Sequence, residues 1–184
     1  MALQKDRYCS FCGTLYPEPL SWPRNCTQCK MMIWANPIPV SVVLVPIQGP
    51  EGLGLLTVRR GIDPRKGFLS LIGGFVEETE SWQAGGAREV EEEVGVLLDA
   101  AQLKPFWFCS TEPRPNRVLL FSVAPTLQLS DLTPFTPNAE SEERGIILGP
   151  DGLEDIFAFP LHTQAARLWF AQQEIHGPHR FRPA

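Results

Sequence analysis

Residues 74–96 read GFVEETESWQAGGAREVEEEVGV, and they predict one amphipathic helix with an acidic face. Ser81 is a favourable N-cap before the helix, and Gly95 is a favourable C-cap after it. Between them lies an apolar stripe at i, i+3 and i+7, the spacing of a core-facing helix: Ala87, Val90 and Val94. We therefore expect a helix over residues 81–94.

The acidic face carries three glutamates, because Glu89, Glu92 and Glu93 stand at i, i+3 and i+4. Carboxylates this close repel one another unless a cation lies between them. Hard divalent cations such as Mg²⁺ prefer oxygen ligands, keep several waters and bind substrate phosphates. The alternative is a solvated acidic helix face, which leaves the glycine at position 74 and Arg88 at their fixed offsets unexplained. Bound cations can neutralise a diphosphate, orient it and activate a water for attack at phosphorus.

The spacing fits the pattern Gly-x5-Glu-x7-Arg-Glu-U-x-Glu-Glu-x-Gly-U, in which U is apolar, at every specified position. This is the Nudix box, and the chain resembles Nudix hydrolases over residues 40–175 in layout and 73–96 in detail. The resemblance implies an α/β fold, specifically an α/β/α sandwich with a mixed sheet. It also implies a metal-dependent hydrolase that cleaves a diphosphate linkage.

The resemblance further implies a role for each matching position of the box. The ligands of catalytic Mg²⁺ (or Mn²⁺) are expected to be three side chains and one backbone carbonyl: Glu89, Glu92, Glu93 and Gly73. Glu80 and Arg88 match residues that brace the loop, helix and following loop through charged hydrogen bonds. Their expected role is structural rather than chemical.

The rest of the chain reads as strands and one further helix. Strands are expected over residues 40–45, 53–58, 69–72, 105–110, 117–124 and 144–148. A second amphipathic helix is expected over residues 161–173, before the Gly177-Pro178 breaker. Strands mixed with two helices indicate an α/β or α+β sandwich.

Two cysteine pairs mark a separate module at the N-terminus. The spacing is Cys-x2-Cys, thirteen residues, then Cys-x2-Cys: Cys9, Cys12, Cys26 and Cys29. Four thiolates complete a tetrahedral Zn²⁺ site with no open position, so this zinc is expected to be structural. Disulfides or a redox pair are the alternatives. We predict a zinc ribbon over residues 1–36 and a Nudix hydrolase domain over residues 37–184.

The charge of the chain argues against a general affinity for nucleic acid, because the net charge is −5. In residues 1–36, four basic residues stand against two acidic ones, and a zinc ion with four thiolates cancels that surplus. No apolar run is long enough for a membrane span, and the first residues lack a secretory pattern. We expect a cytoplasmic protein with a small-molecule nucleotide substrate, and the resemblance implies that it can form a homodimer. The fifth cysteine, Cys109, reads as a buried structural thiol.

A zinc ribbon directly before a Nudix domain resembles the NADH pyrophosphatase group and the related FAD pyrophosphatases. The NADH group carries an SQPWPFPxS-type signature after the box, whereas residues 110–117 read STEPRPNR and do not match it. The segment of residues 140–143, ESEE, lies closer to the FAD-type relatives. In such relatives a glutamate there completes the metal site or acts as the base. Glu140 and Glu143 are therefore catalytic candidates, a solvated loop being the alternative.

Arginines and aromatic residues supply the remaining candidates for substrate binding. Guanidinium groups match phosphate oxygens, and the candidates are Arg59, Arg60, Arg114 and Arg117. Aromatic rings can stack on a purine or flavin, and the candidates are Phe68, Trp107 and Phe159. The alternatives are surface positions for the arginines and core positions for the rings.

Three functions follow from these patterns. The first is hydrolysis of a dinucleotide cofactor or an ADP-ribose-like compound, with FAD, NADH and ADP-ribose as the main substrates. The second is removal of nucleotide caps from RNA 5′ ends by the same chemistry. The third is a Nudix module that senses nucleotides without cutting them, which the intact Glu89, Glu92 and Glu93 disfavour.

Overall fold

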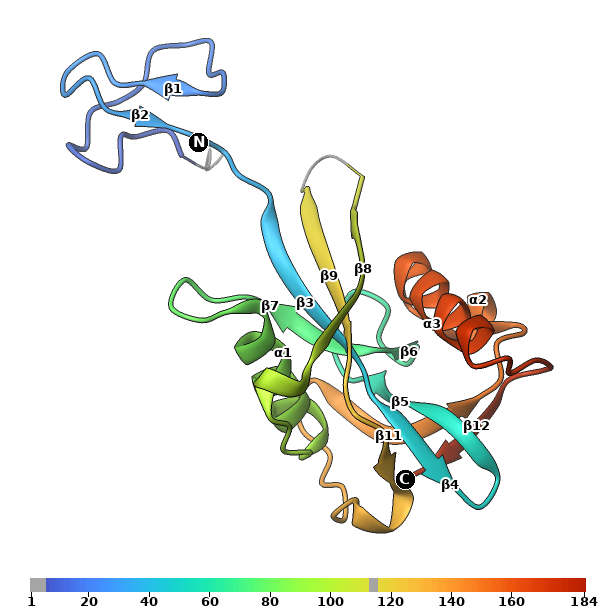
Figure 1. Cartoon of the computed structure of the whole chain (residues 1–184). Coiled ribbons are helices and arrows are strands. Elements are labelled where there is room, and N and C mark those ends of the chain that lie inside the picture. Colours follow the sequence, from blue (N-terminus) through green and yellow to red (C-terminus); the bar gives the residue numbers. More distant parts are fainter. Residues whose placement is uncertain (1–5, 113–115) are drawn as a thin grey trace. The chain divides into compact units, whose positions relative to one another are not determined.

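The computed structural model describes residues 6–112 and 116–184 of the chain. Two units are distinguished, residues 1–37 and residues 38–184. Figure 1 shows the larger unit with its strands at the centre and its helices outside. No helix in the two described ranges is both long and apolar enough to cross a membrane.

The strands of the larger unit form two sheets. The first has four strands in the spatial order β7 (Ile72–Phe75), β3 (Ile38–Leu44), β9 (Arg117–Val123) and β8 (Lys104–Ser110). The second has six, of which five lie in the order β10 (Leu127–Gln128), β4 (Pro46–Gly49), β5 (Gly52–Arg60), β11 (Ser141–Leu148) and β12 (Arg180–Pro183), while β6 (Leu69–Ser70) pairs with β5. In each sheet one pair is parallel, β3 with β9 and β4 with β10, so both sheets are mixed.

Two long helices cover opposite sides of these strands (Figure 1). They are α1 (Trp82–Val94) and α3 (Pro160–Gln172), with the short helix α2 (Leu153–Ile156) just before α3 and 3-10 turns at Ala100–Gln102 and Leu129–Asp131.

Strand β3 shows how the two helices share one layer of strands. Successive side chains of a strand point to opposite faces. Val42 accordingly packs in the cluster that contains Trp169 and Phe170 of α3, whereas Val43 packs in the cluster that contains Val90 of α1. The second half of β3, residues 41–44, is therefore buried on both faces, which is why its residues do not alternate between a polar and an apolar side.

In the smaller unit, β1 (Arg24–Asn25) pairs antiparallel with β2 (Met32–Ile33). Its core is small and is built around Cys9, Tyr16 and Cys26, with Leu20, Cys29 and Ile33 packed against them. A core of this size contributes little stability, so the unit needs a covalent or metal cross-link.

The predicted α/β fold with a mixed sheet is confirmed, and the predicted helices over 81–94 and 161–173 are α1 and α3. The strand predicted over residues 69–72 is instead two short strands, because β6 pairs with β5 of one sheet and β7 pairs with β3 of the other. Several short elements are not foreseen in the sequence, since two to four residues carry no usable periodicity; β4, β10, β12 and α2 are among them.

A buried arginine joins three segments of the larger unit that are far apart in the sequence. Arg144 on β11 is 2% exposed. It donates hydrogen bonds to the backbone carbonyls of Val94 at 2.8 Å, Thr133 at 2.7 Å and Ala184 at 3.1 Å. The ring of Phe135 lies 5.4 Å from its guanidinium carbon. Burial lowers the pKa of Arg144. Its charge is held by backbone dipoles, including those at the C-terminal end of α1.

We expect Arg144→Met to lower the free energy of unfolding by about 3 kcal/mol, because three carbonyls lose a charged donor. Arg167→Met is the control, since Arg167 is exposed and pairs with Glu154 at the surface. Its loss should stay below about 1 kcal/mol. Urea unfolding of the two variants compares them directly, and equal losses would contradict the structural role of Arg144.

Candidate metal-binding active site

Helix α1 begins and ends at the residues that its sequence indicates. The side chain of Ser81 accepts a hydrogen bond from the Ala84 backbone N–H at 3.1 Å. Gly95 is left-handed, with φ of 69°, and its N–H donates to the Glu91 carbonyl at 2.9 Å. The predicted N-cap and C-cap are confirmed, and together they set which glutamates face the strands.

Glycines let the helix and the preceding loop lie against β3. Gly73 has a φ of 154°, and a Cβ there would overlap the Ser41 carbonyl on β3. A Cβ on Gly74 would overlap the carboxylate of Glu89. On the helix itself, a Cβ on Gly86 would lie 2.7 Å from the Ser41 hydroxyl. These close approaches explain why a glycine pair precedes the helix and why α1 tolerates a glycine in its interior.

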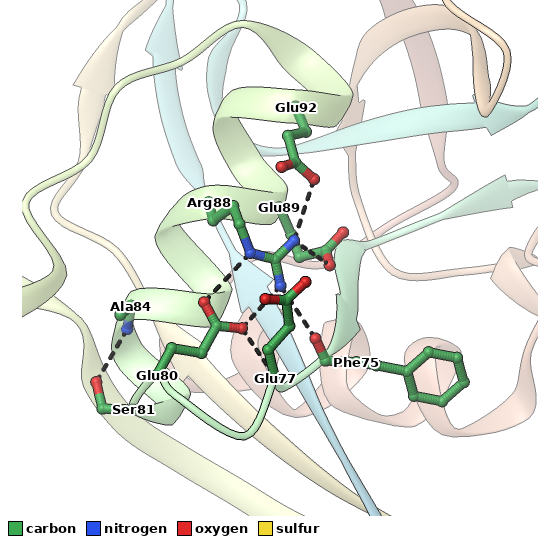
Figure 2. A network of polar contacts seen from close by, with 8 residues as sticks. All are labelled: Phe75, Glu77, Glu80, Ser81, Ala84, Arg88, Glu89 and Glu92. Carbon is green, nitrogen blue, oxygen red and sulfur yellow. Dashed lines mark hydrogen bonds and ion pairs between the residues drawn. The ribbon is translucent and has the colours of Figure 1, made fainter.

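Arg88 is the centre of a polar network that joins the loop to the helix (Figure 2). Its guanidinium contacts both oxygens of Glu80, at 2.8 and 3.2 Å, and the Phe75 carbonyl at 3.1 Å. It also donates to Glu89 at 2.8 Å and to Glu92 at 3.1 Å. The contacts to Glu80 and Phe75 are those that a bracing role requires. The contacts to Glu89 and Glu92 make Arg88 a counter-ion to two of the acidic residues.

Glu80 completes the brace on the loop side. Its Oε1 accepts a hydrogen bond from the Glu77 backbone N–H at 2.9 Å. The hydrogen bonds from Arg88, and next that from Glu77, hold the pKa of Glu80 below its usual value. A Cβ on Gly85 would lie 2.8 Å from the same carboxylate, so this second helix glycine also makes room for the brace.

Glu93 is the acidic residue that the fold buries most effectively at this site. Burial, and then the charges of Glu89 and Glu140, raise the pKa of Glu93 to about 8, although Arg60 and the Gly73 backbone N–H oppose the shift. Its Oε2 is buried and has no hydrogen-bond partner. A buried carboxylate oxygen with an unused lone pair, within electrostatic reach of two further carboxylates, offers the ligand type that a hard cation prefers. The residues present therefore fit a divalent cation.

The three candidate glutamates of α1 differ in burial and in how closely Arg88 holds them. Glu89 is partly buried, and its pKa is raised by burial, with Arg88 opposing the shift. The side chain of Glu92 is 59% exposed and is held by Arg88. Within residues 6–112 and 116–184, only the cysteine cluster brings three or more ligating atoms close enough for one ion. A cation at Glu93 would therefore have to draw the other carboxylates away from Arg88.

The raised pKa of Glu93 predicts a pH-dependent stability of the metal-free protein. The folded state holds this proton up to about pH 8, whereas the unfolded state releases it near 4.5. The stabilising contribution is therefore complete below pH 4.5 and is lost as the pH rises toward 8. Thermal unfolding of the metal-free protein should show this loss of stability as the pH rises. Added Mg²⁺ should restore the stability most at about pH 8. In Glu93→Gln the pH dependence should be absent. An unchanged pH profile in that variant would contradict the assignment.

Of the two later glutamate candidates, Glu140 and Glu143, only Glu140 acts electrostatically on the glutamates of α1. It acts on both Glu89 and Glu93. Glu143 instead forms an ion pair with Arg59, with 2.7 Å between Oε2 and Nε. Glu140 precedes β11, whereas Glu143 lies on it, and a register shift falls between residues 141 and 143 of that strand. Bulges of this kind redirect side chains near functional sites.

The candidate arginines lie in different surroundings. Arg59 pairs with Glu143 and also donates to the Gly67 carbonyl at 3.0 Å. Arg60 acts electrostatically on Glu93, and its guanidinium carbon lies 4.9 Å from the centre of the Phe159 ring. Arg114 falls outside the described residues.

Arg117 lies at the start of β9, beside a half-exposed ring. Its guanidinium carbon is 5.5 Å from the centre of the Phe75 ring, and its buried Nε has no hydrogen-bond partner. Phe75 is 51% exposed, and its carbonyl belongs to the Arg88 network. An unused donor beside an exposed ring is suited to a ligand that carries both an anion and a base.

The candidate aromatic residues also differ in their surroundings. Trp107 stacks on Phe121, with 5.2 Å between the ring centres, and packs against the core. Phe68 lines a cavity of about 510 Å³ beside α3. Phe159 lies between Arg60 and His162, with 5.1 Å between its ring centre and that of His162.

His162 is a buried histidine that the sequence does not single out. Its Nδ1 has no partner, and burial lowers its pKa to about 3, so it is neutral in the folded protein. Its ring meets Phe121 edge-on, with 5.8 Å between the centres. A single histidine in an apolar helix gives no sequence signal, because neutral core histidines look the same.

The four cysteines of the smaller unit form a compact cluster of sulfurs. All four Sγ atoms lie within 4.8 Å of one another, with 3.6 Å between Cys9 and Cys29 and 3.6 Å between Cys12 and Cys26. A tetrahedron with Zn–S bonds of about 2.3 Å has edges of about 3.8 Å. The cluster is therefore consistent with the predicted zinc ribbon.

The two cysteine pairs are held by the same backbone turn. Cys9 donates its N–H to the Thr14 carbonyl, and Cys26 donates to the Met31 carbonyl, five residues further on in each case. The residue four positions after each of these cysteines is left-handed, Gly13 in the first turn and Lys30 in the second. Burial raises the pKa of Cys9, but hydrogen bonds from the backbone N–H groups of Cys12 and Phe11, together with those from the Tyr16 and Cys29 side chains, lower it to about 6. In the first turn the pKa values of Cys9 and Cys12 are both lowered, which favours the thiolate form that binds metal.

Cys109 lies apart from this cluster, on β8. It is partly buried rather than buried as predicted, and it packs against the core. Burial raises its pKa, which disfavours the reactive thiolate. A structural thiol remains the best interpretation.

Comparison with known proteins matches a family model described as the NUDIX domain to residues 37–173. Two curated relatives are named NAD-capped RNA hydrolase NudC. The Deinococcus radiodurans protein is 31% identical over 119 residues, and the Shigella flexneri protein is 29% identical over 113 residues. These alignments cover 64% and 61% of this chain but 41% and 40% of the relatives. The chain thus spans about two fifths of the length of the curated relatives it matches.

Solved structures resemble the chain in fold. The NUDIX hydrolase from Nitrosomonas europaea gives a TM-score of 0.70 at 23% identity, covering 91% of this chain and 92% of that one. The NUDIX domain of Shewanella oneidensis NrtR, in complex with ADP ribose, gives 0.57 at 18% identity, covering 77% and 89%. At these identities the likeness concerns the fold alone.

Proposed function

This chain belongs to the NUDIX family, and on that premise we propose that it is a hydrolase that cleaves the diphosphate linkage of a nucleoside diphosphate derivative. The main substrates we propose are FAD, NADH and ADP-ribose. The observation that carries the proposal is the buried, unpartnered Oε2 of Glu93, which lies within electrostatic reach of Glu89 and Glu140. A catalytic cation site explains why the fold maintains these acids together at a cost in stability.

The proposed ligands of catalytic Mg²⁺ or Mn²⁺ are Glu89, Glu92, Glu93 and the carbonyl of Gly73. When bound, the cation neutralises diphosphate charge and lowers the pKa of a water. Arg88 and Glu80 keep the loop and the helix together, and Arg88 balances the acids before the cation arrives.

We assign the general base to Glu140 rather than to Glu143. The carboxylate of Glu143 is ion-paired with Arg59, so it already has a cationic partner. Glu140 is exposed beside the acidic cluster and can take a proton from the water that attacks phosphorus. With Arg59 committed to that pair, Arg60 and Arg117 are the better-placed groups for substrate phosphates, and Arg114 joins them as a proposal from the sequence. Phe75 and Phe159 offer rings beside these two arginines.

The cysteine cluster, in this proposal, holds one structural Zn²⁺. Its four sulfurs would occupy all four positions of a tetrahedral ion, so no position is open for substrate or water. The zinc stabilises the smaller unit and takes no part in the hydrolysis.

A second candidate function is removal of a dinucleotide cap from RNA. It is favoured by the names of the two relatives, which act on NAD-capped RNA. A dinucleotide cap and a free dinucleotide contain the same diphosphate linkage, so one site can cleave both. The two functions differ in the need for an RNA-binding surface, and the net charge of −5 favours the small molecule.

One screen separates these functions. Purified protein is incubated with FAD, NADH, ADP-ribose and a short NAD-capped RNA, with Mg²⁺ or Mn²⁺, in ¹⁸O-water, and the product masses are determined. We expect two mononucleotide or phosphosugar products, one of which carries ¹⁸O and thereby identifies the attacked phosphorus. A strong preference for the capped RNA would select decapping, and nucleotide binding without any cleavage would select a sensing module.

A further inference from the structure

A small clamp at the C-terminal end of α1 holds the loop that carries Glu140. Asn138 uses both ends of its side-chain amide. Its Nδ2 donates to the Glu92 carbonyl at 3.0 Å and reaches the Glu93 carbonyl at 3.5 Å. Its Oδ1 accepts from the backbone N–H groups of Glu140 at 2.9 Å and Ser141 at 2.8 Å. The two ends of an amide allow it to donate to the helix and accept from the loop at the same time.

A second contact fixes the other side of Glu140. The Gly61 backbone N–H, at the end of β5, donates to the Glu140 carbonyl at 2.7 Å. A Cβ on Gly61 would lie 2.7 Å from the Ala139 carbonyl, so the loop packs directly on this glycine. The backbone of Glu140 is thus held on its N–H side by Asn138 and on its carbonyl side by Gly61.

The helix end that Asn138 contacts carries the predicted cation ligands. The carbonyls it caps belong to Glu92 and Glu93, and the next carbonyl, that of Val94, is capped by Arg144. Free carbonyls at a helix end otherwise need water or other donors. One side chain, 45 or more residues away in sequence, therefore links the helix glutamates directly to Glu140.

We propose that Asn138 is a positioning residue that sets Glu140 against Glu89 and Glu93 and thereby determines the affinity of the site for a divalent cation. The inference rests on the proposed function, because it takes these acids as the cation site. Asn138 does not touch substrate or cation. It acts through Glu140, whose charge already reaches both helix glutamates. Asn138 is exposed, so its removal empties no part of the core.

The test measures Mn²⁺ binding calorimetrically, without substrate, in a double-mutant cycle of Asn138→Ala and Glu140→Gln in the full chain. Outer partners of metal ligands typically contribute about tenfold or more to affinity. We expect each single variant to bind Mn²⁺ about tenfold more weakly, and the double variant to bind as weakly as Glu140→Gln alone. The proposal would be overturned if the losses of the two single variants multiplied in the double variant. It would also be overturned if Asn138→Ala bound Mn²⁺ with wild-type affinity.

A second variant and a control guard against a loss of folding. The new Cβ of Gly61→Ala would displace the Ala139 carbonyl while Asn138 itself is unchanged. This variant should also bind Mn²⁺ more weakly, and combining it with Glu140→Gln should cause no further loss of affinity. Glu142→Gln, two residues after Glu140 at the start of β11, weakens the surface pair with Lys66, and this variant should bind Mn²⁺ as the wild type does. An effect of Glu142→Gln equal to that of Asn138→Ala would assign the change to general loop disturbance and overturn the proposal.

The inference and the proposed function can fail separately. If the wild type hydrolyses a diphosphate but Asn138→Ala binds Mn²⁺ with unchanged affinity, the proposed function stands and the role of Asn138 is contradicted. If Asn138→Ala and Glu140→Gln weaken Mn²⁺ binding non-additively but the wild type cleaves no diphosphate, the role of Asn138 stands and the proposed hydrolase function is contradicted. A wild-type protein that binds no Mn²⁺ would remove the cation site itself and both proposals with it.

Discussion

Glu93→Gln should reduce diphosphate hydrolysis by about a thousandfold at saturating Mg²⁺, while the protein remains folded. The amide has nearly the shape of the carboxylate but no charge, so it is a poor ligand for a hard cation. Folding should survive because burial disfavours the charge that the substitution removes. The measurement is the steady-state rate with the best substrate from the screen, together with the unfolding temperature of each variant.

The matched control for this prediction is Glu91→Gln. It makes the same change on the same helix, but Glu91 is exposed and is not among the predicted ligands. Its rate should stay within about twofold of the wild type, in line with ordinary surface substitutions. Turnover by Glu93→Gln at the wild-type rate would exclude the proposed mechanism, whereas an equal loss in both variants would point to general damage of α1.

Loss of zinc should unfold the smaller unit. We expect the purified protein to contain one Zn²⁺ per chain, and Cys26→Ser to lose it, because Cys26 is 1% exposed and belongs to both the cluster and the core of that unit. Structural zinc contributes about 10 kcal/mol or more to small domains of this kind. Elemental mass spectrometry measures the zinc content, and proteolysis of residues 6–37 measures the unfolding of the smaller unit.

Cys109→Ser provides the control for the zinc prediction. It makes the same change at a cysteine that is partly buried and lies outside the cluster. Its zinc content and the protease resistance of residues 6–37 should be unchanged. Full zinc occupancy in Cys26→Ser would contradict the four-thiolate site, and zinc loss in Cys109→Ser would show that the fifth cysteine takes part.

The local features of the acidic helix were predictable because they depend on neighbours in the sequence. The boundaries of α1 follow from Ser81, Gly95 and the apolar stripe between them, and the structure confirms both caps. The cysteine cluster was predictable for a similar reason, since each Cys-x2-Cys pair forms its own turn. The α/β class followed from the order of strand and helix patterns.

The choice between equivalent candidates was not predictable from the sequence. Glu140 and Glu143 lie in the same acidic segment, and only the pairing of β11 with β5 puts Glu143 opposite Arg59, whereas Glu140 precedes the strand and acts on Glu89 and Glu93. Arg59 and Arg60 are neighbours on one strand, yet they contact Glu143 and Phe159 respectively, because successive strand residues face opposite ways.

The sequence by itself determined the family of this protein and the local elements of the proposed site, since ligand types, caps and helical spacing are set by residues close together in the chain. Tertiary structure alone decided how that chemistry is assembled. Asn138, Gly61 and Arg144 approach α1 or Glu140 only after strands far apart in sequence have paired. Long-range pairing is governed by the packing of whole faces, and no local pattern records which distant amide or guanidinium will meet a given carbonyl.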